Sequence, residues 1–276
     1  MKSKNVIIGA GAVTAIILSV FAISSLLGNK EHDSDFSKKN TQISGKKEES
    51  AEKYEESSTN NSDSSAEKDE SNSRASKDDW NLVLVNKKNV LDHEVSFNQV
   101  SMTEGKSIIV DERIEEALQS YVDGAKAAGY SIQYVSGYRS RADQQVVYNN
   151  SLQQNISSGM SEEQAKEATE SLINPPGSSE HMTGLAVDIA GSDALAAYPQ
   201  LEGDMDKYES QQWLINHAPD YGFILRYPKD TRSTEKTMID YESWHFRYVG
   251  KDIAKYITEN QITLEEYLDK LPDKEQ

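Results

Sequence analysis

The segment SSEHMTGLAVDIA, residues 178–190, contains a predicted strand with a charge at its centre. Apolar residues run from Leu185 to Ala190 almost without a break, which is typical of a strand buried on both faces. Asp188 interrupts this run, and a buried carboxylate without a partner strongly disfavours folding. His181 stands seven residues earlier, in a turn after a Pro-Pro-Gly loop. We therefore expect Asp188 to have a specific partner, either a metal ion or a buried arginine.

The residues around this segment predict one domain from Trp80 to about Leu271, within the region 80–276. Helical spacing and capping residues indicate helices at 112–128, from 141, from 161, and at 209–218, 251–260 and 263–271. Short apolar runs indicate strands at 81–86, 131–136, 185–190, 222–226 and 245–249. Helices and strands are mixed without regular βαβ alternation. This order predicts an α+β fold with a small, largely antiparallel sheet flanked by helices.

Several of these helices have explicit start signals. Capping boxes are predicted for the pairs Ser140 with Asp143, Ser161 with Gln164, and Thr263 with Glu266. Asp111 is expected to cap the first helix, and Gly129 is placed to end it.

Two segments precede the domain. Residues 6–27 are an apolar run of 22 residues without a charge, long enough to cross about 30 Å of hydrocarbon. A cleaved signal peptide has a shorter apolar core of about 7–15 residues, so we expect residues 1–29 to form an uncleaved membrane anchor rather than a signal segment. Lys2 and Lys4 would keep its N-terminus in the cytoplasm. Residues 30–79 are rich in Ser, Glu, Lys, Asp and Asn, which predicts a disordered, charged linker.

The composition excludes some classes of partner. The formal net charge is −17, and binding to nucleic acid needs a basic surface, so nucleic acid is not expected as a partner. The chain has no cysteine, which excludes a disulfide framework and a lipid-modified cysteine.

Two of the five histidines lie in patterns that suggest chemistry. In YESWHFRY, residues 241–248, the strand period places His245 and Arg247 on one face. With His181 and Asp188, His245 would complete the set of three nitrogen and oxygen ligands that catalytic zinc uses. Glu242, three residues before His245, could be the general base that a metal-activated water needs. Spacing alone leaves open the alternative that Asp188 pairs with an arginine and the histidines are unrelated; His32, His93 and His217 are read as ordinary histidines.

Four motifs then follow one another along the chain. They are SGYRS at 136–140 with Gln144, SxHxxGxAxD at 179–188, YGF at 221–223 with RYP at 226–228, and ExxHxRYVG at 242–250. Together they resemble the VanY-type D-alanyl-D-alanine carboxypeptidases and the related L,D-carboxypeptidases of peptidoglycan, over about residues 80–271. The resemblance implies a zinc peptidase fold shared with the D,D-dipeptidases and the hedgehog signalling domain.

The resemblance also implies a role for each matching residue. The zinc ligands would be His181, Asp188 and His245. Glu242 would be the catalytic base and Arg139 the residue that steadies the oxyanion. Gln144 and Ser179 would lie near the terminal carboxylate of the substrate.

The implied function is that of a zinc metallocarboxypeptidase that trims the C-terminal D-Ala from peptidoglycan stem peptides, through Glu242-assisted attack of a metal-bound water. A D,D-enzyme would act on the pentapeptide stem and an L,D-enzyme on the tetrapeptide stem; spacing leaves both open, with a slight preference for the L,D type. The alternatives are a catalytically silent, zinc-stabilised module that binds cell-wall peptides, and a structural wall spacer. We expect a monomer anchored in the cell membrane, with its domain facing the wall of a Gram-positive envelope.

Overall fold

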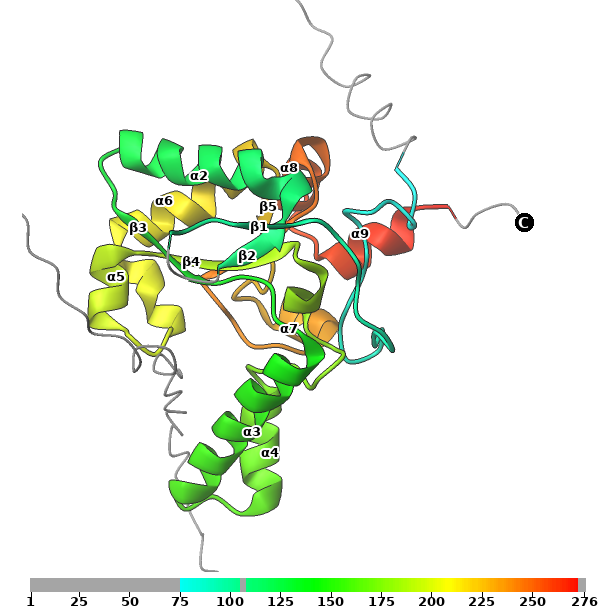
Figure 1. Cartoon of the computed structure of the whole chain (residues 1–276), viewed down its shortest axis with the longest axis vertical. Helices are drawn as coiled ribbons and strands as arrows, with labels where there is room; N and C mark the ends of the chain where they lie inside the picture. The colour runs from blue at the N-terminus through cyan, green and yellow to red at the C-terminus, as the bar shows by residue number, and fades with distance from the viewer. Residues whose placement is uncertain (1–74, 105–107, 273–276) are drawn as a thin grey trace, which may run out of the picture.

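The centre of the fold is an antiparallel sheet of four strands (Figure 1), seen in a computed structural model that describes residues 75–104 and 108–272. In spatial order its strands are β3 (Ile132–Ser136), β4 (Ala186–Gly191), β6 (His245–Tyr248) and β5 (Phe223–Leu225). All three pairings are antiparallel. A second, two-stranded sheet joins β1 (Gln99–Ser101) to β2 (Ile109–Asp111). The prediction of an α+β fold with small antiparallel sheets is confirmed.

The two faces of the main sheet carry different side chains. Val187, Ile189 and Phe246 are buried in an apolar core on one face, where two helices cover the sheet. These helices are α2 (Glu115–Ala127) and α6 (Glu209–His217). Because side chains alternate along a strand, Asp188 and His245 project from the opposite face. The core therefore holds the sheet from one side and leaves the other side for polar chemistry.

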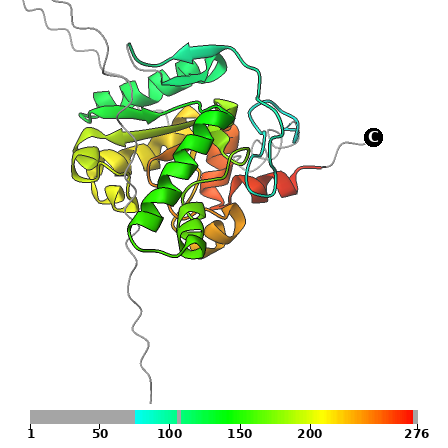
Figure 2. The same ribbon diagram turned by 60° about the horizontal axis from the view of Figure 1, so that its bottom comes forward.

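Further helices surround the sheet (Figures 1 and 2). They are α3 (Arg141–Ser157), α4 (Glu162–Glu170), α5 (Ser192–Ala197), α7 (Thr231–Thr237), α8 (Lys251–Glu259) and α9 (Leu264–Lys270). The predicted capping boxes are present at the starts of α3, α4 and α9. Asp111 also caps as predicted, although the first turn, Glu112–Ile114, is a 3-10 turn that leads into α2.

Helices α3 and α4 form a hairpin that extends away from the body of the domain (Figure 1). Asn155 of α3 is buried between them and donates a hydrogen bond of 3.0 Å to the hydroxyl of Thr169 on α4. The hairpin begins directly after the loop that follows β3, so its first turns lie beside the polar face of the sheet.

The predicted strand at 81–86 is wrong. These residues have no strand partner in the described part of the chain, and the carbonyl oxygens of Asn81 and Val83 instead accept hydrogen bonds from the guanidinium of Arg247, at 3.1 and 2.8 Å. Leu82 is fully buried against α8 and α9, which explains the apolar pattern. Elements β1, β2, α5 and α7 were not predicted from the sequence. The segment of α7, TRSTEKT, contains no apolar side chain that could have indicated its periodicity.

The predicted anchor (1–29) and nearly all of the predicted linker (30–79) lie outside the described residues. Among residues 75–104 and 108–272, no helix is both long and apolar enough to cross a membrane.

Gly137, in the loop after β3, should tolerate no side chain. A Cβ atom there would lie 2.2 Å from the carbonyl oxygen of Ile109, a backbone atom of β2. We expect Gly137→Ala to lower the free energy of unfolding by about 1–3 kcal/mol, as overpacking does elsewhere. Chemical denaturation of the metal-free protein measures this. Gly159→Ala, where a Cβ would meet nothing within 4 Å, is the control and carries backbone strain alone; equal losses in both variants would contradict the prediction.

Candidate metal and active site

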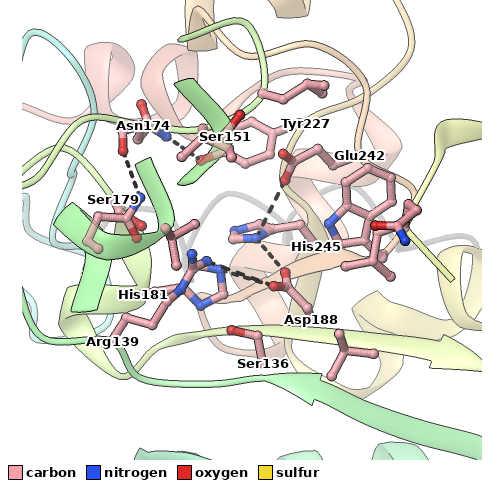
Figure 3. Close-up of a pocket in the computed structure, with 18 of the residues that line it drawn as sticks. Ser136, Arg139, Ser151, Asn174, Ser179, His181, Asp188, Tyr227, Glu242 and His245 are labelled. Atoms are coloured by element: carbon pink, nitrogen blue, oxygen red, sulfur yellow. Dashed lines mark hydrogen bonds and ion pairs between the residues drawn. The ribbon is translucent and has the colours of Figure 1, made fainter. Parts of the chain in front are cut away.

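The register of the two central strands brings the first two candidate ligands together (Figure 3). β4 and β6 pair so that Asp188 lies directly opposite His245. Residues opposite each other on antiparallel strands project from the same face. Nδ1 of His245 is 3.0 Å from Oδ1 of Asp188, and both side chains are almost completely buried. The sheet therefore fixes this pair without help from a loop.

His181 reaches the same point from a short 3-10 turn, Glu180–Thr183, which ends at Gly184 with φ of +70°. Nδ1 of His181 lies 2.8 Å from the carbonyl oxygen of Gly137, and this contact assigns its proton to Nδ1. Nε2 is thereby directed at Oδ2 of Asp188, 3.4 Å away. The loop after β3 thus orients this imidazole.

These three residues fit a zinc ion. One ligand atom from each of His181, Asp188 and His245 can be chosen so that all three lie within 4.8 Å of one another. A tetrahedral site with bonds of about 2.0–2.2 Å places neighbouring ligand atoms about 3.4 Å apart, close to the separations of 3.0 and 3.4 Å around Asp188. Two imidazoles and one carboxylate are a donor set that leaves a fourth zinc position for water or substrate.

The ionisation of the three residues is set by their contacts. Burial, together with Arg139, lowers the pKa of His181 to about 4, so this ring is neutral and ready to bind metal at pH 7. Although burial opposes it, the two histidines hold the pKa of Asp188 well below its usual range. Burial also opposes protonation of His245, yet Asp188 and Glu180 raise its pKa to about 9. Metal binding near neutral pH therefore displaces a proton from His245.

Glu242 lies beside this set without belonging to it. Its Oε2 is 3.7 Å from Nδ1 of His245, and Figure 3 shows its carboxylate directed toward the same space. Burial raises the pKa of Glu242 to about 8, against the opposing effect of His245. In the metal-free site this carboxyl group is therefore mostly protonated at pH 7, and a bound metal cation would shift it toward the carboxylate form.

The remaining predicted residues line the same cavity of about 310 Å³. Arg139 places Nη2 3.9 Å from Oδ2 of Asp188, while its Nε is buried without a hydrogen-bond partner among the described residues. Gln144 donates from Nε2 to the carbonyl of Asn174 at 2.7 Å and leaves Oε1 unpaired among the described residues. Ser179 is 3% exposed. All seven predicted residues therefore meet around one cavity, whereas His93 and His217 are elsewhere on the surface.

Other polar residues of this region were given no role from the sequence, although Arg226, Tyr227 and Arg247 lie in its motifs. Asn174 and Tyr227 line the cavity, and the buried Oδ1 of Asn174 has no partner among the described residues. Glu180 forms buried ion pairs with Arg226 and Arg247. A signal did exist for Arg247, because it interrupts a buried strand on the same face as His245, as Asp188 interrupts β4.

Residues 107–251 match the VanY family, described as D-alanyl-D-alanine carboxypeptidase. Over 195 residues the chain is 34% identical to the D-alanyl-D-alanine carboxypeptidase of Enterococcus faecalis, covering 71% of this chain and 68% of that protein. The chain is also 41% identical, over 157 residues, to a relative from Bacillus subtilis. The match covers about half (52%) of the length of that relative.

Two solved structures have folds similar to that of this chain. One is a variant of the vancomycin-resistance D,D-pentapeptidase VanY in complex with Zn(II), with a TM-score of 0.60, 35% identity, and coverage of 68% of this chain and 99% of that one. Another is the LD-carboxypeptidase LdcB, with a TM-score of 0.56, 36% identity, and coverage of 70% and 88%.

The ligand assignment predicts which histidine the metal needs. We expect His181→Ala to lose the single zinc ion that the unmodified chain binds, because two remaining ligands hold zinc too weakly. His217→Ala is the matched control, since His217 is on the surface beside Asp220. Equilibrium dialysis with metal analysis measures the stoichiometry. In thermal unfolding, zinc at about 100 times its Kd should stabilise the control by about 2.7 kcal/mol. One zinc per chain in His181→Ala would refute the assignment.

Proposed function

We propose that this chain, which belongs to the VanY family of D-alanyl-D-alanine carboxypeptidases, removes the C-terminal D-alanine from peptidoglycan stem peptides by zinc-assisted hydrolysis. One observation carries the proposal: a buried carboxylate, Glu242, stands beside a set of three zinc ligands without being one of them. Such an arrangement supplies a base next to an open metal position.

The zinc ion and Glu242 would have different roles in the hydrolysis. Bound zinc supplies a Lewis acid that activates water and polarises the scissile carbonyl. Glu242 accepts the proton of the attacking water and returns it to the departing amine of D-alanine. Burial raises the pKa of Glu242, and the positive charge of a bound zinc ion would lower it again, toward the carboxylate form that accepts a proton. Burial of the carboxylate excludes bulk water from this exchange.

Arg139 and the polar end of the cavity would hold the substrate. We assign Arg139 to the developing oxyanion, an interaction whose loss commonly costs about 100- to 1000-fold in rate. The unpaired Nε of Arg139 and its position 3.9 Å from Asp188 support this role. Gln144 and Ser179 are assigned to the terminal carboxylate of the substrate, since both line the cavity beside Arg139. The second N–H of the Gln144 amide, beside the one that donates to Asn174, and the hydroxyl of Ser179 are donors that such a carboxylate could use.

We propose the D,D reaction on pentapeptide stems as the main activity, in line with the family description. The L,D reaction on tetrapeptide stems is the second candidate, because the chain is as similar to LdcB as to VanY, at 36% and 35% identity. A catalytically silent binding module explains the site less well, since such a module needs neither Glu242 nor Arg139. We further propose that residues 1–29 anchor the enzyme in the membrane, with the domain facing the cell wall.

Glu242→Gln tests the chemistry. We expect kcat to fall by about 100- to 10,000-fold, because the amide cannot accept the proton, while one zinc ion remains bound. Glu235→Gln, an exposed change on α7, should leave kcat unchanged. Release of D-alanine from a stem peptide measures the rate, and metal analysis checks the loading. Normal turnover of zinc-loaded Glu242→Gln would show that another group is the base.

Muropeptides with pentapeptide and tetrapeptide stems test the substrate. Mass spectrometry should show loss of one alanine from the pentapeptide stem, and a chelator should abolish the loss. Shortening of the tetrapeptide stem alone would replace the D,D assignment by the L,D one. No shortening of either stem by the zinc-loaded protein would favour the binding module.

A further inference from the structure

The second ring nitrogen of His245 faces a buried carboxylate. Since Nδ1 points at Asp188, the proton of the neutral ring must lie on Nε2 when Nδ1 binds metal. Nε2 is 3.6 Å from Oε2 of Glu180. Both atoms are buried, and neither has a hydrogen-bond partner among the described residues. Glu180 is therefore placed to accept the outer proton of this ligand, after a small tilt of the ring.

The other oxygen of Glu180 is held by two arginines. Oε1 accepts hydrogen bonds from Nε of Arg226 and from Nη1 of Arg247, both at 2.8 Å. The side chains of all three residues have 0% exposure. The carboxylate thus cannot rotate toward solvent, and its free oxygen stays directed at His245. With both guanidinium groups on Oε1, Oε2 is the acceptor atom that faces the ring of His245.

The arginines are held in turn by both ends of the domain. Glu265 of α9 binds Arg226 through two hydrogen bonds, at 2.9 and 2.6 Å, and accepts a third from Asn86 at 3.0 Å. Arg247 donates to the carbonyls of Asn81 and Val83, as described for the fold. Asn81, Val83, Asn86 and Glu265 all lie outside residues 107–251, the part of the chain that matches the family.

We propose that Glu180 is a positioning residue for the metal ligand His245, and that the segment 81–86 and helix α9 complete the metal centre by fixing Glu180 through Arg226 and Arg247. Outer partners of this kind fix the orientation of a metal-binding imidazole and raise its basicity as a ligand. The proposal builds on the zinc site of the proposed function, but it concerns metal binding and does not depend on the substrate.

The chemistry of a carboxylate makes the proposal testable by Glu→Gln changes. Glu180 uses one oxygen for two guanidinium donors and directs the other at Nε2 of His245, 3.6 Å away. An amide has a single acceptor oxygen and two donor hydrogens. A glutamine in place of Glu180 could therefore serve the arginines or His245, but not both. The same holds at Glu265, where both oxygens accept from Arg226.

Zinc affinity of the full chain, purified in detergent because of its apolar residues 6–27, is the decisive measurement. Competition with a chromophoric chelator gives the Kd, and the visible spectrum of the Co(II) form reports ligand geometry. We expect Glu180→Gln to weaken zinc binding by about 10- to 100-fold, the usual effect of losing an outer partner, and to change the Co(II) spectrum. Glu265→Gln, one contact further out, should weaken binding by at least about threefold.

Glu266→Gln is the matched control on the same helix. Glu266 belongs to the capping box of α9 and pairs with Arg232 on the surface, whereas Arg226 takes its hydrogen bonds from the neighbouring Glu265. The zinc Kd and Co(II) spectrum of this control should match those of the unmodified chain. The proposal is overturned if Glu265→Gln is folded and binds zinc as the control does, whether or not Glu180→Gln folds. If the unmodified chain binds no zinc, the proposed function is wrong as well. If the unmodified chain binds zinc and Glu265→Gln binds it equally well, only the positioning role is wrong.

Discussion

The pairing of Asp188 with His245 across two central strands is the constraint on which the rest of the site depends. A carboxylate at this depth is stable when opposite charges or a metal surround it. The register of β4 and β6 supplies the first imidazole directly, and the turn before β4 supplies the second. From two loops, Arg139 then approaches Asp188, and Glu242 approaches His245. The chemistry of the cavity is therefore built outward from one strand position.

Side chains alternate along β4, so the strand that directs Asp188 into the cavity also directs apolar side chains into the core on the other face. Val187 and Ile189 flank Asp188 in sequence and pack with α2 and α6. A shift of one residue in the register would exchange the two faces, and would bury the aspartate in an apolar core. Stability of the sheet and placement of the metal ligands thus have one common cause, which is the hydrophobic pattern of β4.

Much of this could be predicted from sequence, because the signals are local. Capping boxes marked the starts of α3, α4 and α9, and the motifs placed the ligands in one cavity. Segment 81–86 was mistaken for a strand, because its carbonyls bond to an arginine more than 160 residues away, which no local pattern reveals. Glu180 was missed for the same reason: its partners Arg226 and Arg247 are 46 and 67 residues distant.

The hairpin of α3 and α4 is specified by local sequence, unlike the metal centre, which depends on contacts between distant residues. This difference affects the expected order of folding. Its two helices carry their own caps and touch each other within about thirty residues of chain, so they can form early. The metal centre joins His245 to Asp188 across 57 positions, and its outermost contacts use the last helix of the domain. Contacts of such sequence separation form slowly. We therefore expect metal binding to follow the folding of the whole domain.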